Sequence, residues 1–295
     1  IMYVSMKPIL QHAHAHGYAV PAINCINMEM ARGAISAAEE ARAAIIINLG
    51  VGQMGNHAHS EEMVPMIKEL TARATVPVAL NLDHGGRLED IARCLNLGFS
   101  SVMIDASSFD FEENIRRTAI VSAMAHALNV CVEGELGHVG QANARDDEDA
   151  DLYTNPKQAR EFVERTGVDA LAVAIGTAHG NYLHHKVPRL DFDRLRELKS
   201  LLNMPLVLHG GSGSGDENLR KAVSCGINKV NICTDAFQIC KTAFLQTQAQ
   251  QPDMDYMHLC MAVEQQMKAF TRHHLDVLGA SGQYVYGENV TDSHE

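Results

Sequence analysis

Short apolar runs alternate with longer segments of helical periodicity along most of the chain. Segments with apolar residues three or four positions apart, such as Met30 to Arg42 and Ile91 to Leu97, separate the runs, and several follow an Asp, Asn or Ser. Most runs are apolar almost throughout, as expected of strands that are covered on both faces. The eight runs are Tyr18 to Asn24, Ala44 to Gly50, Val76 to Asp83, Ser101 to Ser107, Val130 to Leu136, Ala170 to Gly176, Pro205 to His209 and Lys229 to Thr234. Eight strand and helix units predict an α/β protein, a single (β/α)8 TIM barrel with an extra C-terminal helix.

One domain accounts for this pattern. The 295 residues allow two domains at about 150 residues each, but one barrel of about 250 residues also fits. The sequence contains no internal repeat and no long Pro/Gly/Ser linker. We therefore expect residues 1–279 to form the barrel and a terminal helix over Asp255 to Leu278, and residues 280–295 to form a tail that tends to disorder.

The polar segment Gly137 to Asn155 is the main irregularity. It is longer than an ordinary connection between a strand and a helix, and it carries clustered acids. A mobile lid and a solvated acidic loop both fit this composition.

Composition and charge exclude several classes of protein. Hydrophobic residues make up 46% of the chain and charged residues 20%, which excludes wholesale disorder. The 36 acidic residues against 24 basic ones give a net charge of −12. This charge argues against nucleic-acid or membrane partners, which attract a basic surface. An anionic ligand must then be bound by a local site.

The cysteines and the apolar segments favour a cytoplasmic protein. The seven cysteines are scattered and form no C-x-x-C pair, so neither a disulfide framework nor a zinc knuckle is indicated. Residues 1–8 lack the pattern of a signal peptide, and the densest apolar segment, Ala43 to Ile47, is far shorter than a membrane span.

Three of the 16 histidines fall at or just beyond the end of a predicted strand: His84, His179 and His209. In a barrel of this kind, functional groups gather at the carboxyl ends of the strands. A catalytic zinc ion takes three protein ligands and leaves one position open, so these three histidines predict a metal site.

Other histidines and the lysines are interpreted differently. His12, His14 and His16 precede the first strand, and His57 and His59 are expected just inside a helix, so both motifs are assigned to solvated helix faces. Schiff-base chemistry is disfavoured because Lys229 lies early in the eighth strand, away from the catalytic rim.

Carboxylates accompany the predicted metal ligands. Asp83 precedes His84 and is either a general acid/base or a helix cap. Glu133 and Glu135 are two positions apart on one strand, so they share a face. These acids are second-shell groups for the histidines, a second metal position together with Asp105, or members of buried salt bridges, and the sequence does not rank the three.

Glycine-rich and polar segments follow the seventh and eighth strands. Gly210 to Gly215 alternates Gly and Ser directly after the seventh strand, and Asn231 to Asp235 ends the eighth. Loops at these two positions bind phosphate in many barrels through backbone N–H groups and a helix N-terminus. Phosphate binding is therefore favoured over a plain flexible turn.

Several motifs together resemble the class II, metal-dependent ketose-bisphosphate aldolases, and most closely their tagatose-bisphosphate branch. The similarity extends from Tyr3 to Thr234. It rests on Tyr18-Ala-Val-Pro-Ala-Ile-Asn, Leu82-Asp-His, Ser101-Val-Met-Ile-Asp-Ala-Ser, Glu133-Gly-Glu-Leu-Gly, Leu152-Tyr-Thr-Asn-Pro, Ala172-Val-Ala-Ile-Gly-Thr-Ala-His-Gly and Leu208-His-Gly-Gly-Ser-Gly.

The resemblance implies an activity and a site. It implies reversible cleavage of a ketose (bis)phosphate to dihydroxyacetone phosphate and an aldehyde through a zinc-stabilised enediolate, with Asp83 as the acid/base. His84, His179 and His209 would bind Zn2+, and a monovalent cation, Na+ or K+, is often nearby. A homodimer or homotetramer is expected. The implied phosphate- and substrate-binding residues are Asn24, Gly180, Gly210, Gly211, Ser212, Asn231, Ile232, Cys233 and Thr234.

Three departures from the family pattern concern the rest of the site. The acid that shuttles the carbon-bound proton normally lies in a Gly-Gly-x-Glu-Asp segment, which is absent here, and Asp146, Asp147 or Glu148 are its candidate replacements. Gly50 stands where the branch usually has Ser or Thr. Only Lys268 and Arg272 are candidates for the clamp on the distal phosphate.

Three functions therefore remain open. The first is an aldolase, either for a ketose bisphosphate or for a sugar or sugar-acid phosphate that lacks the second phosphate. The second is a zinc-dependent barrel hydrolase that uses the H-x-H motifs. The third is a phosphate-binding module that has lost catalysis.

Overall fold

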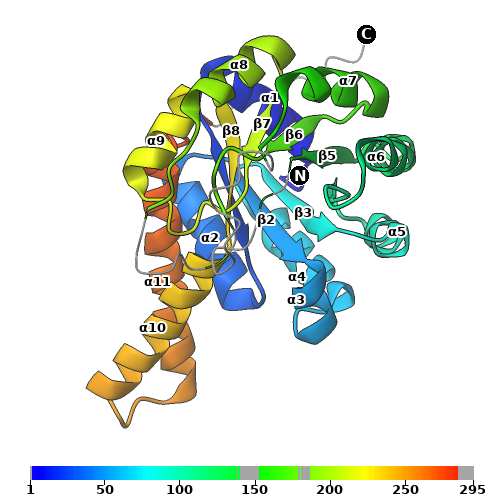
Figure 1. The fold of residues 1–295 in the computed structure, drawn as a ribbon. Coiled ribbons are helices and arrows are strands. Elements are labelled where there is room, and N and C mark those ends of the chain that lie inside the picture. Colours follow the sequence, from blue (N-terminus) through cyan, green and yellow to red (C-terminus); the bar gives the residue numbers. More distant parts are fainter. Residues whose placement is uncertain (1, 138, 140–152, 179, 181–186, 285–295) are drawn as a thin grey trace.

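Eight parallel strands form a closed barrel in the order of the sequence (Figure 1). The computed structural model describes residues 2–137, 139, 153–178, 180 and 187–284. Neighbouring strands pair in parallel, and β8 closes the barrel on β1, with Val20 opposite Lys229. The strands are β1 Val20–Asn24, β2 Ile45–Gly50, β3 Val78–Gly85, β4 Ser101–Ile104, β5 Cys131–Leu136, β6 Ala170–Val173, β7 Leu206–Leu208 and β8 Ile227–Ile232. The predicted (β/α)8 barrel is confirmed.

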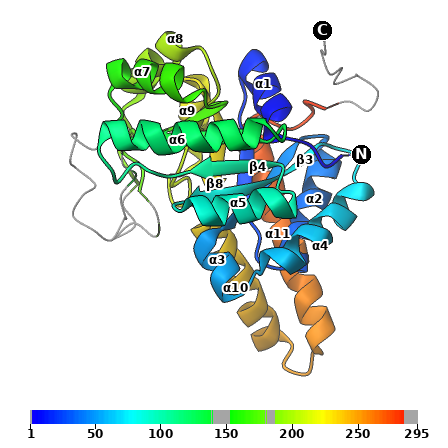
Figure 2. The same cartoon turned by 90° about the vertical axis from the view of Figure 1, so that its right-hand side faces the viewer.

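Helices surround the barrel and extend beyond it. They are α1 Met6–His16, α2 Met28–Ala41, α3 Val51–Asn56, α4 Ser60–Ala72, α5 Leu88–Leu97, α6 Phe111–His126, α7 Pro156–Thr166, α8 Phe192–Leu202, α9 Asp216–Ser224, α10 Thr234–Gln250 and α11 Tyr256–Val277. The predicted terminal helix is α11, whereas α10 was not predicted. These two helices pack together as a hairpin that projects from the barrel (Figures 1 and 2).

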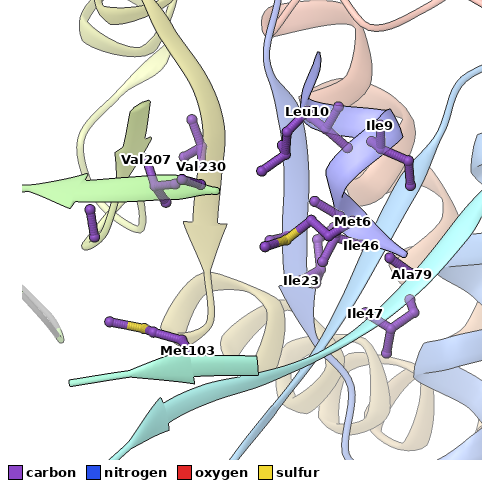
Figure 3. Packing of buried hydrophobic residues seen from close by; sticks show 14 of the residues in the cluster. Met6, Ile9, Leu10, Ile23, Ile46, Ile47, Ala79, Met103, Val207 and Val230 are labelled. Carbon is purple, nitrogen blue, oxygen red and sulfur yellow. The ribbon is translucent and has the colours of Figure 1, made fainter. Parts of the chain in front are cut away.

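Helix α1 covers the N-terminal end of the barrel. Met6, Ile9 and Leu10 are buried on its inner face, and Met6 lies beside Ile23 and Ile46 of the first two strands (Figure 3). Its first N–H group donates to the Ser101 hydroxyl at the start of β4 over 2.9 Å. The end of the barrel opposite the catalytic rim is therefore filled by a helix.

The H-x-H motifs lie outside the metal-compatible groups that the described residues form. His12, His14 and His16 are on α1, where the Nδ1 atom of His14 is 2.7 Å from the Lys199 amine. The prediction that His57 and His59 lie just inside a helix is wrong: α3 ends at Asn56, and the pair occupies the turn between α3 and α4.

Helices α2 and α11 approach very closely at Gly33. A Cβ atom on Gly33 would lie 2.7 Å from the Glu264 carbonyl oxygen and 3.1 Å from Met267 Cβ. Arg32 pairs with Glu264 beside this contact. Residues 280–284 continue from α11 to the end of α2, where the Gly282 N–H group donates to the Ala41 carbonyl over 2.7 Å.

The barrel interior contains a buried ion pair. The Lys229 Nζ atom on β8 lies 2.6 Å from Oε2 of Glu133 on β5, and both side chains are fully buried. A charge in a low-dielectric interior is stable only when it is paired and hydrogen-bonded. The Lys229 amine is therefore committed to Glu133.

The cysteines agree with the sequence analysis, since all seven are free thiols. Among the described residues, no helix has the length and apolar run needed to cross a membrane. The longest helix, α11, has many charged and polar residues along its length.

We expect Gly33→Ala to lower the free energy of unfolding by about 1–3 kcal/mol, because the added methyl group must displace the α11 backbone. Gly55→Ala is the matched control, since a Cβ at this exposed helical position meets no atom within 4 Å. Urea denaturation of both variants checks the prediction. Equal midpoints for both variants would contradict the close packing of α2 on α11.

Lys229→Met leaves the Glu133 carboxylate without its cation, and we expect a loss of about 3–5 kcal/mol in the free energy of unfolding. The double variant Lys229→Met/Glu133→Gln removes the buried charge as well and should recover part of the loss. Denaturant titration measures all three proteins. A single variant as stable as the wild type would show that the pair contributes nothing.

Candidate functional site

The side chains predicted to carry chemistry meet at the carboxyl ends of the strands. Asp83 and His84 end β3, Glu133 and Glu135 lie on β5, and His209 follows β7. A cavity of about 30 Å³ opens beside Asp83 and His84, whereas Glu133, Glu135 and His209 do not line it. It is lined by Asn24, Asp83, His84, Gly180, Gly210, Ser212, Asn231, Cys233 and Thr234. All nine residues belong to the set that the sequence analysis proposed.

His84 is placed by an irregularity in β3. The strand continues to Gly85, two residues further than predicted, and its pairing with β4 shifts register between Leu82 and Gly85. His84 has a φ of 52°, a left-handed conformation that costs energy for a residue with a Cβ atom. Such a bulge redirects a side chain, and here it turns the imidazole toward His209.

Two imidazoles face each other at the centre of the site. His84 Nε2 and His209 Nδ1 are 2.9 Å apart. The other nitrogen of each ring meets a carboxylate, since His84 Nδ1 lies 2.8 Å from Asp105 Oδ2 and His209 Nε2 lies 2.8 Å from Glu133 Oε1. When both rings donate their N–H to these carboxylates, the two facing nitrogens present lone pairs. Such a pair binds a cation, and imidazole nitrogens held by carboxylates are typical ligands of a divalent metal.

The electrostatic environment of the two rings differs. Burial lowers the pKa of His84, but the charge of Asp83 and the hydrogen bond to Asp105 outweigh it and raise the pKa to about 10. Complete burial lowers the pKa of His209, which keeps this ring neutral. Burial raises the pKa of Glu133, but the Lys229 charge and the His209 hydrogen bond hold it below its usual range. The carboxylates thus stabilise positive charge at the two facing nitrogens, carried by a proton on His84 or by a metal ion that replaces it, and Glu133 fixes the tautomer of His209.

Asp83 is held by two amides. Asn24 Nδ2 donates to its Oδ2 over 3.0 Å, and Asn231 Nδ2 donates to its Oδ1 over 2.9 Å. Asp83 is only 7% exposed and lines the cavity. Burial raises the pKa of Asp83, but the charges of His84 and Lys229 and the hydrogen bond from Asn24 outweigh burial and lower it. The carboxylate is therefore ionised and oriented toward the cavity.

The described residues form two groups in which a metal ion could be held, and in each group one ligand atom per residue lies within 4.8 Å of the others. One group is Asp83, His84 and His209, and the other is His84, Asp105 and Glu135. The Ser107 hydroxyl donates to Asp105 Oδ1 over 2.8 Å. Burial and the Asp105 charge raise the pKa of Glu135 to about 8, so this side chain is protonated at neutral pH. Glu135 Oε2 lies 3.9 Å from His84 Nδ1. Asp105 orients the His84 ring through the contact of its Oδ2 atom with His84 Nδ1.

The loop after β7 closes tightly on its neighbours. Gly210 has a φ of 65°, and a Cβ atom there would lie 2.5 Å from the Ala178 carbonyl oxygen, so only glycine fits. The Ser212 hydroxyl accepts from the Asp235 N–H group at the start of α10 over 3.2 Å. This arrangement brings a glycine loop and a helix N-terminus to one wall of the cavity, as a phosphate site requires.

Two predicted phosphate-binding residues do not line the cavity. The Gly211 N–H group donates to the Asn231 carbonyl over 3.0 Å, and the Ile232 side chain is fully buried. Both residues support the wall of the site.

The two candidates for a distal phosphate clamp are engaged with acids. Lys268 pairs with Glu40 of α2 over 2.5 Å, and Arg272 pairs with Asp276 over 3.1 Å. Neither residue lines the cavity, so the structure gives no support to the assignment, which rested only on their position in the terminal helix.

The third predicted metal ligand, His179, lies outside the described residues, as do Asp146, Asp147, Glu148 and most of the Gly137 to Asn155 segment. The sequence analysis missed Gln53, whose amide contacts Asn24, Gly50 and Cys233. Its position three residues after Gly50, at the start of a helix, was the available signal.

Comparison with known proteins agrees with this geometry. Residues 4–283 match the family model described as fructose-bisphosphate aldolase class-II. The chain is 41% identical over 267 residues to the uncharacterized protein YdjI of Escherichia coli K12, covering 90% of this chain and 94% of that protein.

Solved structures share the fold. The crystal structure of the YdjI aldolase from Escherichia coli K12 superposes with a TM-score of 0.84 at 37% identity, covering 96% of this chain and all of the other. A putative fructose-1,6-biphosphate aldolase from Coccidioides immitis gives 0.81 at 30% identity, with 94% and 96% of the two chains covered. Fructose-bisphosphate aldolase from Campylobacter jejuni gives 0.79 at 23% identity, with 95% and 96% covered, which bears on the fold alone. With its matched length, its barrel and its paired rim histidines, the chain belongs to the class II fructose-bisphosphate aldolase family, and it is an aldolase.

Proposed function

We propose that this aldolase cleaves a ketose phosphate reversibly into dihydroxyacetone phosphate and an aldehyde, with zinc as its metal. The observation that carries the proposal is the placement of Asp83, an ionised carboxylate held by two amides beside the facing nitrogens of His84 and His209. A base and a cation site at one reacting centre separate proton transfer from charge stabilisation.

His84 and His209 would hold the metal, with His179 as the third expected ligand. A bound zinc ion supplies positive charge that polarises the substrate carbonyl and stabilises the enediolate formed when the carbon–carbon bond breaks. The chain supports this chemistry with Asp105 and with the Glu133 and Lys229 pair, which keep both imidazoles oriented.

Asp83 is the group that exchanges the proton of the C4 hydroxyl. Its two oxygens each accept one amide hydrogen, which fixes the plane of the carboxylate and leaves lone pairs directed into the cavity. In the cleavage direction, Asp83 accepts the hydroxyl proton as the C3–C4 bond breaks, and the hydroxyl becomes the aldehyde. An acid on the 137–155 segment, with Asp146, Asp147 and Glu148 as candidates, would then return a proton to carbon.

The phosphate of dihydroxyacetone phosphate would bind between the loop after β7 and the N-terminus of α10. Gly180, Gly210, Ser212 and Thr234 line this side of the cavity. Backbone N–H groups and the positive end of a helix hold a phosphate without basic side chains. A monovalent cation, Na+ or K+, would add positive charge there.

The distal half of the substrate is best explained by a sugar or sugar-acid phosphate without a second phosphate. Among the described residues that line the cavity, none is a lysine or an arginine. Lys268 and Arg272 are engaged on α11, and Gly50 offers no hydroxyl where the tagatose-bisphosphate branch usually has one. These three observations favour this alternative over a ketose bisphosphate.

Chelation should abolish carbon–carbon cleavage, because the facing imidazoles would lose the cation they share, and added Zn2+ should restore it. Sodium borohydride in the presence of substrate should leave the rate unchanged, since none of the described residues that line the cavity is a lysine. A coupled assay for dihydroxyacetone phosphate measures both effects. Borohydride inactivation would contradict the proposal.

Asp83→Asn should lower kcat/KM by about 10²–10⁴, because the amide cannot accept the hydroxyl proton. His57→Ala is the matched control, because this exposed histidine lies in the turn after α3. A barrel hydrolase that used the H-x-H motifs would give the opposite pattern. The same assay with both variants decides between the two enzyme classes.

The substrate is best sought by condensation. Dihydroxyacetone phosphate is offered with glyceraldehyde 3-phosphate, lactaldehyde, and neutral and acidic aldoses, and the products are identified by mass and configuration. Faster condensation with aldoses that carry no phosphate is the expected result. Exclusive use of glyceraldehyde 3-phosphate would restore the bisphosphate assignment. A phosphate-binding module would form no product and would exchange no carbon-bound proton of dihydroxyacetone phosphate with deuterium.

A further inference from the structure

Gln53 on α3 makes polar contacts with three residues close to the catalytic carboxylate of Asp83. Its Oε1 atom accepts from the Gly50 N–H group over 3.0 Å and from Asn24 Nδ2 over 3.2 Å. Its Nε2 atom lies 3.4 Å from the Cys233 sulfur. One side chain thus connects the carboxyl ends of β1, β2 and β8.

The direction of these hydrogen bonds follows from the backbone. A side-chain amide can rotate by 180° and exchange its donor and acceptor, but a backbone N–H group is only a donor. The Gly50 N–H group therefore fixes the Gln53 oxygen on its own side. The same oxygen can accept only from a donor, so it fixes the NH2 group of Asn24 toward Gln53.

This orientation determines what Asp83 meets. Asn24 Nδ2 has two hydrogens, one directed to Gln53 Oε1 and the other to Asp83 Oδ2 over 3.0 Å. Were the Asn24 amide to rotate, its oxygen would face the Asp83 carboxylate, and the two would repel each other. The fixed amide also leaves Asn24 Oδ1 buried, with no hydrogen-bond partner in the described part of the chain.

The Asn231 amide provides a comparison on the other side of Asp83. Its Nδ2 atom donates to Asp83 Oδ1 and lies 3.3 Å from His209 Nε2. Its oxygen, like that of Asn24, is buried and has no partner among the described residues. Asp83 thus depends on two amides of the same orientation, and Gln53 is the residue that fixes one of them.

We propose that Gln53 is a positioning residue for proton transfer by Asp83, acting through Asn24. This inference rests on the proposed function, because it assigns Gln53 to the step in which Asp83 exchanges the hydroxyl proton. The simpler interpretation is that Gln53 only caps α3, since a glutamine at the third helical position often accepts a hydrogen bond from the N-cap N–H group. A cap stabilises the helix but does not select one reaction step.

Two reactions of dihydroxyacetone phosphate distinguish a positioning role of Gln53 from a role that is limited to capping α3. Exchange of the carbon-bound proton of dihydroxyacetone phosphate with solvent deuterium does not use Asp83 in the proposed mechanism, whereas condensation with an aldehyde does. Gln53→Met keeps the length of the side chain and removes the acceptor. We expect it to lower kcat for condensation by about tenfold to a hundredfold, with deuterium exchange within about twofold of the wild type.

Matched variants control for other effects. Gln53→Glu keeps an acceptor oxygen for both Gly50 and Asn24 and should lose several-fold less condensation activity than Gln53→Met. Asn56→Met alters an exposed amide of the same helix that bonds only to the Gly52 carbonyl, and it should affect neither half-reaction. In the Asn24→Ala background, Gln53→Met should have no further effect, because the two residues act as one unit.

The outcomes distinguish this inference from the proposed function. A wild-type enzyme that neither exchanges nor condenses dihydroxyacetone phosphate would overturn the proposed function itself. A wild-type enzyme active in both reactions, with Gln53→Met losing both equally or neither, would overturn only the role of Gln53. Additive effects of Gln53→Met and Asn24→Ala would likewise show that Gln53 does not act through Asn24.

Discussion

The facing nitrogens of His84 and His209 impose the main constraint on this molecule. Two imidazole nitrogens 2.9 Å apart require positive charge at the contact, which the proton of a charged His84 ring or a bound metal ion supplies. The protein holds them there with an acid behind each ring: Asp105 for His84, and Glu133, itself paired with the buried Lys229, for His209. The ion pair in the barrel interior therefore contributes to the geometry of the reacting centre as well as to the core.

The same centre would allow an acidic protein to accommodate the phosphorylated ligand that we propose. The chain carries a net charge of −12, and the described lining of the cavity has no lysine or arginine. Positive potential would come from His84 or the metal that it holds, the N–H groups of the loop after β7 and the N-terminus of α10. The attraction for an anion is thus confined to one end of the barrel, which agrees with a small ligand rather than a polyanion.

The sequence predicted the barrel well because its strands are buried on both faces and therefore read as continuous apolar runs. The rim residues Asp83, His84 and His209 were found because parallel strands place their carboxyl ends at one edge. The bulge that turns His84 toward His209 depends on the register between β3 and β4, which no local pattern encodes. Lys268 and Arg272 could be named only as candidates, because helix periodicity does not say which face a terminal helix presents to the barrel.

Gln53 shows a further limit of sequence reasoning. Gly50 was noticed as a departure from the family pattern, but the side chain that reaches the site comes three residues later, from the first turn of α3. The missing hydroxyl at Gly50 and the amide of Gln53 can be related to each other only in the folded structure, where the two residues are in contact. A departure from a family motif is easier to interpret once the structure shows which side chain lies at the corresponding place in the site.

The central claim is that imidazole nitrogens at the barrel rim hold the metal. X-ray absorption at the zinc edge of the zinc-loaded protein tests it directly. The account predicts nitrogen or oxygen atoms at about 2.0–2.1 Å from the zinc ion, with imidazole scattering that weakens in His84→Ala. A sulfur shell at about 2.3 Å, or a spectrum unchanged by His84→Ala, would contradict it.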